Sequence, residues 1–244
     1  MSLFIIIPAY NEAQNIEQCV NDWYRIVETH NDDGGSRLVI VNDGSKDQTG
    51  EKLQFMAGSR PLLVPITKEN GGHGSAVLYG YRYAVEHGAE WVFQTDSDGQ
   101  TNPDEFEDFW RNREKFDAVI GERPVRGDGP MRKVIEKVVC FLLKMIFGIR
   151  VSDANAPFRL MKSKLLAKYI GRLPKDFNLP NIMLTTYFVY FKESVLFLPI
   201  TFQPRKAGKN SINLKKIFRI GWKALGDFIS LKKDIDHQIP EHVQ

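Results

Sequence analysis

The sequence predicts an α/β domain with a mostly parallel central sheet. Three observations point to this fold class. Short apolar, β-branched runs alternate with longer helical patterns, which is the order of βαβ units. The runs lack a polar alternate position, as strands buried on both faces do. Clusters of polar residues and glycines follow the runs, where crossover connections begin. We expect strands at residues 3–7, 38–41, 62–64, 91–95 and 118–121.

Turn residues and prolines mark where the predicted elements of residues 1–76 begin and end. Pro8 ends the first strand, and a helix is expected from about Glu12 to Glu28. The second strand closes on the turn residues 42–47, and a glycine-rich segment at 69–76 leads into the helix after the third strand.

The fourth and fifth strands have equally clear boundaries. The fourth runs from Trp91 to Thr95, and residues 102–105 (Asn-Pro-Asp-Glu) begin the next helix, with proline early and acids in the first turn. The fifth strand ends at Gly121. Helical patterns with one apolar face are expected at 131–149 and 214–231.

The polar residues after the strands should meet at one edge of the sheet. In open α/β sheets, ligands bind outside the carboxyl ends of the strands. Residues that are far apart in the sequence therefore converge on one site. The candidates at this edge are Tyr10, Glu12, Asp43, Gly72, Asp96 and Asp98.

Asp96 and Asp98 form the most informative motif, because a buried strand runs directly into two carboxylates two positions apart. Hard cations such as Mg²⁺ or Mn²⁺ prefer oxygen ligands and keep positions for water or phosphate. The pair therefore predicts a cation that holds a diphosphate. The alternative is that Asp98 belongs only to the turn before the helix at 102–105.

Five motifs in order resemble those of family 2 glycosyltransferases, most closely the dolichyl- or polyprenyl-phosphate sugar transferases. They are residues 8–12 (Pro-Ala-Tyr-Asn-Glu), 42–45 (Asn-Asp-Gly-Ser), 96–100 (Asp-Ser-Asp-Gly-Gln), 151–161 and 204–211. The resemblance implies a nucleotide-sugar-binding, Rossmann-like domain of GT-A type at residues 1–212. A C-terminal amphipathic helix and tail would occupy 213–244.

The resemblance also implies roles for the donor side. Pro8, Tyr10 and Glu12 would flank the nucleotide, and Asp43 would accept from the base edge of uracil or guanine. Gly72 would let a phosphate approach the backbone. Each has a structural alternative: Tyr10 packs, Glu12 caps a helix, and Asp43 forms an Asx-turn. His73 follows, either as a cation near the phosphates or as a plain polar turn residue.

The acceptor side rests on three further residues. Asp153 is a candidate for a base or supporting role, or else an N-cap or a structural partner of Arg159. Arg123 and Arg205 are candidates to hold an anionic acceptor. A sugar hydroxyl needs a base within reach, whereas a lipid phosphate is already ionised.

The predicted activity is metal-dependent transfer from a UDP- or GDP-sugar to an acceptor, and the resemblance implies inversion at the anomeric carbon. The expected acceptor is a polyprenyl phosphate. One alternative is a saccharide acceptor in cell-surface polysaccharide or glycolipid synthesis. A second is a non-catalytic nucleotide-sugar-binding subunit, which the intact Asp96 and Asp98 pair disfavours.

Bulk properties agree with an enzyme near a membrane. The 244 residues carry a net charge of +3, and no nucleic-acid-binding motif appears. The two cysteines, Cys19 and Cys140, suit a reducing compartment. No stretch is long and apolar enough to span a bilayer, so we expect a cytoplasmic protein, peripheral on the inner face of the membrane. The apolar faces of 131–149 and 214–231 either lie on lipid, cover the sheet or form a homodimer contact.

Overall fold

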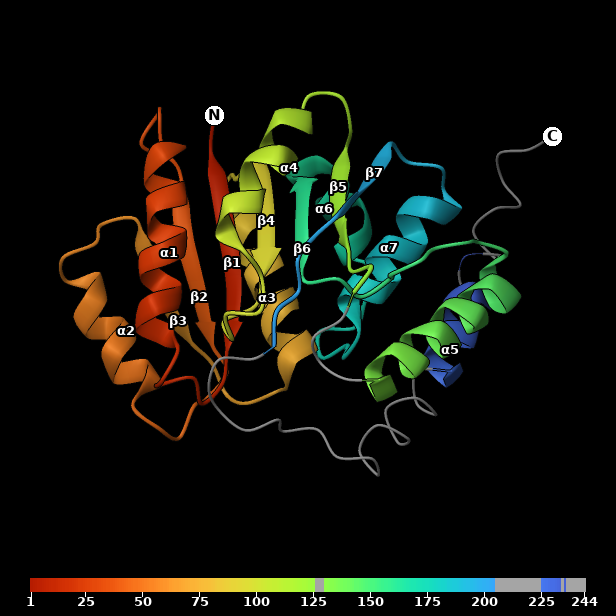
Figure 1. Cartoon of the computed structure of the whole chain (residues 1–244), viewed down its shortest axis with the longest axis horizontal. Coiled ribbons are helices and arrows are strands. Elements are labelled where there is room, and N and C mark those ends of the chain that lie inside the picture. Colours follow the sequence, from red (N-terminus) through yellow and green to blue (C-terminus); the bar gives the residue numbers. More distant parts are fainter. Residues whose placement is uncertain (126–129, 205–224, 234, 236–244) are drawn as a thin grey trace.

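A seven-stranded sheet runs through the centre of the computed structural model, which describes residues 1–125, 130–204, 225–233 and 235 (Figure 1). The strand order is β3-β2-β1-β4-β6-β5-β7. The strands are β1 Leu3–Ala9, β2 Arg37–Asn42, β3 Leu63–Thr67, β4 Trp91–Thr95, β5 Ala118–Glu122, β6 Phe158–Lys162 and β7 Val195–Pro199. All are parallel to their neighbours except β6, which is antiparallel to both β4 and β5.

Helices cover both faces of the sheet, each over its own hydrophobic core (Figure 1). The helices are α1 Ile16–Thr29, α2 Thr49–Ala57, α3 His73–Glu86, α4 Phe106–Asn112, α5 Pro130–Phe147, α6 Ser163–Ile170 and α7 Pro180–Tyr190, with a 3₁₀ turn at Pro103–Glu105 before α4. One core packs α1, α2 and α4 against the sheet, and the other packs α3, α5, α6 and α7. The five predicted strands and the mostly parallel sheet are confirmed.

Three expected boundaries are wrong, each for a local reason. The first strand continues through Pro8, its expected end, to Ala9, because its pairing with β4 stops at Ile6 and no strand on that side needs the missing N–H of the proline. The first helix begins at Ile16 rather than Glu12, because the Glu12 carbonyl first closes a separate turn with the amides of Asn15 and Ile16. The third strand extends to Thr67 and includes Pro65. A proline is tolerated there because β3 lies at the edge of the sheet, where no further strand needs its missing N–H.

The antiparallel strand β6 was not predicted, and it matters for the site. Because β6 runs opposite to β4 and β5, its first residue, Phe158, lies at the edge where those strands end. The loop before β6 is thereby brought to the carboxyl-terminal edge of the sheet. This loop contains Asp153.

Helix α5 differs from the expected arrangement of its apolar face. The sequence placed Val138, Leu142 and Met145 together, but the structure buries Leu143 and Phe147. It leaves Val138 and Met145 more than half exposed, at 51% and 68%. We define the α5 stripe as the exposed residues Val134, Val138, Phe141 and Met145.

The predicted helix at 214–231 lies mostly outside the described residues, as does Trp222. Residues 225–233 are helical. Phe228 and Leu231 are buried in the same core as α3 and α7, and the Phe228 ring lies 6.5 Å from that of Phe147. The domain boundary at 212/213 stays a prediction.

Candidate functional site

Short contacts tie the loops at the carboxyl-terminal edge to one another. The Ser97 hydroxyl donates to the Pro8 carbonyl at 2.9 Å, which joins the ends of β4 and β1. The Asp43 amide donates to the Ala9 carbonyl at 2.9 Å, which joins the ends of β2 and β1. The predicted convergence of these loops on one edge is therefore seen in the structure.

Asp96 lies between the end of β4 and the start of α3. Its side chain is 25% exposed, and its Oδ1 accepts hydrogen bonds from His73 Nε2 at 3.0 Å and from Gln94 Nε2 at 3.2 Å. The buried Gln94 and the exposed His73 ring therefore hold the Asp96 carboxylate from two sides, at the carboxyl-terminal edge of the sheet.

Asp98 follows in a tight turn. Its Oδ1 accepts from the Gln100 amide at 3.2 Å, and Gly99 has a φ of 71°, a conformation that glycine adopts without strain. The cap of the following 3₁₀ turn is Asn102, whose side chain accepts from the Asp104 amide. Asp98 thus shapes its own turn but is not the helix cap.

The carboxylate pair fits a cation whose shell is completed by a ligand. In the described part of the chain, no group of three or more His, Cys, Asp or Glu side chains is arranged to hold a metal. Two carboxylates are too few for a closed site. They suit a hard cation such as Mg²⁺ or Mn²⁺, which keeps waters and takes substrate phosphate oxygens as its other ligands.

His73 adds a titratable group beside this pair. Desolvation lowers the pKa of the imidazole, but the charge and hydrogen bond of Asp96, together with the charges of Asp98 and Asp43, outweigh it. The net result is a raised pKa. The contact makes His73 a hydrogen-bond partner of Asp96, and its role near the phosphates stays a prediction.

Asp43 is buried, with 2% of its surface exposed, and its carboxylate organises the glycine turn. Oδ2 accepts from the Gly72 amide at 2.7 Å, and Oδ1 accepts from the Gly71 amide at 3.0 Å and from Lys68 Nζ at 2.6 Å. The anion that this turn holds is thus Asp43 itself. The expectation that these glycine amides bind a phosphate is not supported by this arrangement.

Asp43→Ala is expected to weaken binding of the preferred nucleoside diphosphate by about 1–3 kcal/mol, the cost of unmet hydrogen-bond partners in a closed site. Isothermal calorimetry measures the change. Asp108→Ala is the control, because Asp108 lies on α4 away from these loops and forms a solvent-exposed ion pair with Arg111. Unchanged affinity in Asp43→Ala would contradict a role in nucleotide binding.

Tyr10 and Glu12 follow β1 in different settings. Tyr10 is 39% exposed and directly follows the end of β1. Glu12 is buried, and its Oε2 accepts from Asn15 Nδ2 at 2.7 Å. An open polar hollow of about 780 Å³ lies between the starts of α1 and α2 and is lined in part by Glu12 and Asp47. Asp96 is not among its lining residues, so we do not assign the diphosphate to it.

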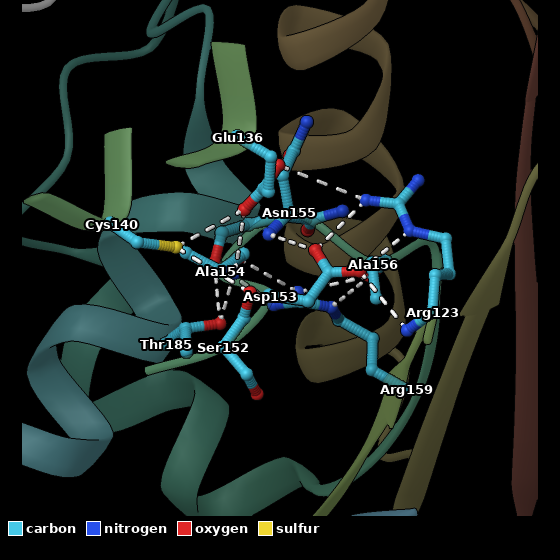
Figure 2. A network of polar contacts seen from close by, with 11 residues as sticks. Arg123, Glu136, Cys140, Ser152, Asp153, Ala154, Asn155, Ala156, Arg159 and Thr185 are labelled. Atoms are coloured by element: carbon cyan, nitrogen blue, oxygen red, sulfur yellow. Dashed lines mark hydrogen bonds and ion pairs between the residues drawn. The ribbon is translucent and has the colours of Figure 1, made fainter. Parts of the chain in front are cut away.

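Arg123 and Asp153 form a buried, two-pronged ion pair (Figure 2). Arg123 Nε donates to Asp153 Oδ2 at 2.6 Å and Nη2 donates to Oδ1 at 2.9 Å, with both side chains 4% exposed. Glu136 of α5 lies 4.0 Å from the same guanidinium and accepts from the Ala154 amide. The guanidinium also lies over the ring of Phe202, 4.9 Å from its centroid.

The structural role expected for Asp153 is therefore present. Its carboxylate forms an ion pair with Arg123, and its charge also acts on Arg159. Arg159, which the sequence suggested as the partner, is fully buried and donates to the carbonyls of Ala154, Ala156 and Asn181. Burial is the main cause that lowers the pKa of its guanidinium. Arg205 lies outside the described residues.

Several contributing residues were not found from the sequence. Lys68 pairs with Asp43 across a loop, and Glu136 reaches the Asp153 loop from α5; neither sits in a motif. Gln94 offered a signal, because a polar residue inside a fully buried strand needs a buried partner.

Comparisons agree with this architecture. The sequence matches the family described as Glycosyl transferase family 2 over residues 4–170, and the chain belongs to that family. Polyprenol monophosphomannose synthase of Mycolicibacterium smegmatis is 27% identical over 221 residues, or 86% of this chain and 80% of that protein. The UDP-N-acetylglucosamine–dolichyl-phosphate N-acetylglucosaminyltransferase of Methanococcus voltae is 31% identical over 184 residues, covering 67% and 70%.

Solved structures share the fold. Glucosyl-3-phosphoglycerate synthase from Mycobacterium tuberculosis, solved in complex with Mn²⁺, UDP and glucosyl-3-phosphoglycerate, gives a TM-score of 0.66 at 17% identity and covers 95% of this chain and 80% of that one. The predicted GT-A-type α/β fold is confirmed. The protein is a glycosyltransferase.

Proposed function

We propose that this enzyme transfers a sugar from a nucleoside diphosphate sugar to a polyprenyl phosphate, with inversion and with the help of a divalent cation. The observation that carries the donor half is the partly exposed Asp96 and Asp98 pair beside the turn that Asp43 organises. The two carboxylates would hold Mg²⁺ or Mn²⁺. The cation, when bound, neutralises charge on the departing diphosphate.

The hydrogen bonds that the Asp153 carboxylate accepts support an acceptor that is already ionised. Its Oδ2 accepts from the Arg123 amide and Nε, and its Oδ1 accepts from Arg123 Nη2 and the Asn155 amide. Because two donors already occupy each oxygen, a sugar hydroxyl would have to displace one of them to deliver its proton there. A phosphate monoester oxygen attacks without giving up a proton and needs no such base. The names of the two relatives described above, a polyprenol monophosphomannose synthase and a dolichyl-phosphate transferase, support the same class of acceptor.

The test is transfer from a panel of UDP- and GDP-sugars to a short polyprenyl phosphate, to the matching polyprenol and to free saccharides. We expect product with the phosphate and none with the polyprenol, because only the phosphate supplies an ionised nucleophile. Transfer to a saccharide alone would favour the second candidate acceptor. Binding without any transfer would favour the non-catalytic subunit.

The α5 stripe supports action at a membrane surface. No helix in the described ranges combines the length and hydrophobicity needed to cross a bilayer. The α5 stripe, however, repeats at helical spacing, with Phe141 60% exposed and Lys137 and Lys144 also exposed on α5. Apolar residues flanked by lysines suit the surface of anionic lipid. The inward side of α5 carries Glu136, so this surface adjoins the Asp153 loop.

Val138→Glu/Phe141→Glu is expected to abolish most binding to anionic vesicles, because burial of each apolar side chain in lipid contributes roughly 1.5–3 kcal/mol. Cosedimentation at low and high salt measures binding, and salt should weaken that of the wild type. Phe55→Glu is the matched control, because Phe55 is 86% exposed on α2, at the other end of the sheet (Figure 1). Equal loss in Phe55→Glu, or none in the double variant, would contradict this surface.

A further inference from the structure

A chain of buried amides connects Asp96 to the core between the sheet and helices α3 and α7. Tyr81 donates from its hydroxyl to Asn181 Oδ1 at 2.9 Å. Asn181 Nδ2 donates to Gln94 Oε1 at 2.8 Å, and Gln94 Nε2 donates to Asp96 Oδ1 at 3.2 Å. Each donor in this chain points toward Asp96.

The side chains in this hydrogen-bond series are buried, so each would destabilise the fold if it lost its partner. Tyr81 and Gln94 are fully buried, and Asn181 is 2% exposed. Buried polar side chains destabilise a fold unless their hydrogen bonds are met, and here each meets the next. Gln94 is the fourth of the five residues of β4 and lies on the same face as Val92, a core residue, where an apolar side chain would pack without any polar partner.

We propose that Gln94 and Asn181 are positioning residues that hold Asp96 ready for the cation. The direction of the bonds is the basis. Because Asn181 donates to Gln94 Oε1, the Gln94 amide must turn its N–H₂ group toward Asp96. The carboxylate then accepts one fixed bond from inside the protein. Groups that hydrogen-bond to metal ligands fix their orientation and raise affinity for the metal.

The same chain extends to the acceptor side. The Asn181 carbonyl accepts from Arg159 Nη1 at 3.1 Å, and Arg159 also binds the carbonyls of Ala154 and Ala156, on either side of Asn155 and next to Asp153. The side chain of Asn181 thus supports Asp96, and its backbone supports the Asp153 loop. One residue of α7 therefore sets the placement of both halves of the site.

This inference rests on the proposed cation site, and the experiment separates the two. Mn²⁺ is titrated onto protein saturated with UDP or GDP, whichever binds more tightly, and followed by calorimetry and by the spin-resonance signal of free Mn²⁺. We expect Gln94→Met and Asn181→Leu to weaken Mn²⁺ binding by about 10-fold or more, the usual effect of losing a group that supports a metal ligand. Tyr81→Phe, which removes only a hydroxyl, should weaken it less. Nucleotide affinity without metal should not change.

Thr186→Val is the matched control. Thr186 is fully buried on the same helix, but its hydroxyl bonds within α7, to the Ile182 carbonyl. A loss of Mn²⁺ affinity in Thr186→Val equal to that in Gln94→Met would overturn the inference, as would wild-type affinity in folded Gln94→Met and Tyr81→Phe. If Gln94→Met does not fold, the Mn²⁺ affinity of Tyr81→Phe decides, and wild-type affinity in that variant would overturn the inference. Absence of Mn²⁺ binding by the wild type would overturn the cation site and, with it, this inference.

Discussion

Asp96→Asn and Asp98→Asn are each expected to reduce sugar transfer at least about 100-fold while leaving the fold intact. The reason is electrostatic: each substitution removes one negative charge from the place where a cation would meet the diphosphate, and charge stabilisation of this kind is worth several kcal/mol in a transition state. Steady-state transfer rates at a series of Mn²⁺ concentrations measure the loss, and circular dichroism checks the fold.

Asp104→Asn is the matched control for this pair. Asp104 is an exposed acid in the same segment, eight residues beyond Asp96, and contributes only to the first turn of the 3₁₀ helix. Its rate should stay near that of the wild type. Wild-type rates in both Asp96→Asn and Asp98→Asn, or undiminished transfer in excess EDTA, would contradict the cation assignment.

Arg123→Met is expected to lower the free energy of unfolding by about 3–5 kcal/mol, because it leaves Asp153 buried without its guanidinium. Urea denaturation measures the change. Arg123→Met/Asp153→Leu should recover part of the stability, since the buried charge is then removed as well. Neither variant is expected to transfer sugar normally, because the loop before β6 loses its anchor.

Lys162→Met is the control for the buried pair. Lys162 and Asp117 make a similar ion pair at 2.9 Å, but both side chains are 36% exposed. Exposed pairs contribute about 0–1 kcal/mol, so this variant should lose little. If Arg123→Met cost no more than Lys162→Met, the Arg123–Asp153 pair would not anchor the loop.

Strand-end motifs made the donor side of the site predictable. A buried run that stops at a carboxylate defines both a strand and its edge, so the order of residues alone was enough to place Asp43 and Asp96 together. Their individual contacts could not be predicted in this way. Asp43 binds Lys68 and the Gly71 amide across a loop, and loop geometry of that kind leaves no periodic pattern in a sequence.

The acceptor side was harder to predict because it depends on strand direction. Residues 158–162 were not predicted as a strand, and the direction of β6 follows only from its pairing with β4 and β5. Without that direction, Asp153 could not be placed opposite Arg123, and Arg159 was predicted as its partner instead. The antiparallel direction of β6 brings the loop that carries Asp153 to the end of β5, where Arg123 lies.

The reversal of β6 also gives the segment between β5 and β6 a defined place in the fold. The chain leaves the sheet after β5 and returns through β6, its immediate neighbour, at the same edge. Everything between these strands, α5 and the Asp153 loop included, is an excursion with both ends fixed side by side. A change of length in the loops of such an excursion need not shift the register of any strand. Under the proposed function, variation in these loops would alter the choice of acceptor while β1, β2 and β4 keep the donor residues in place.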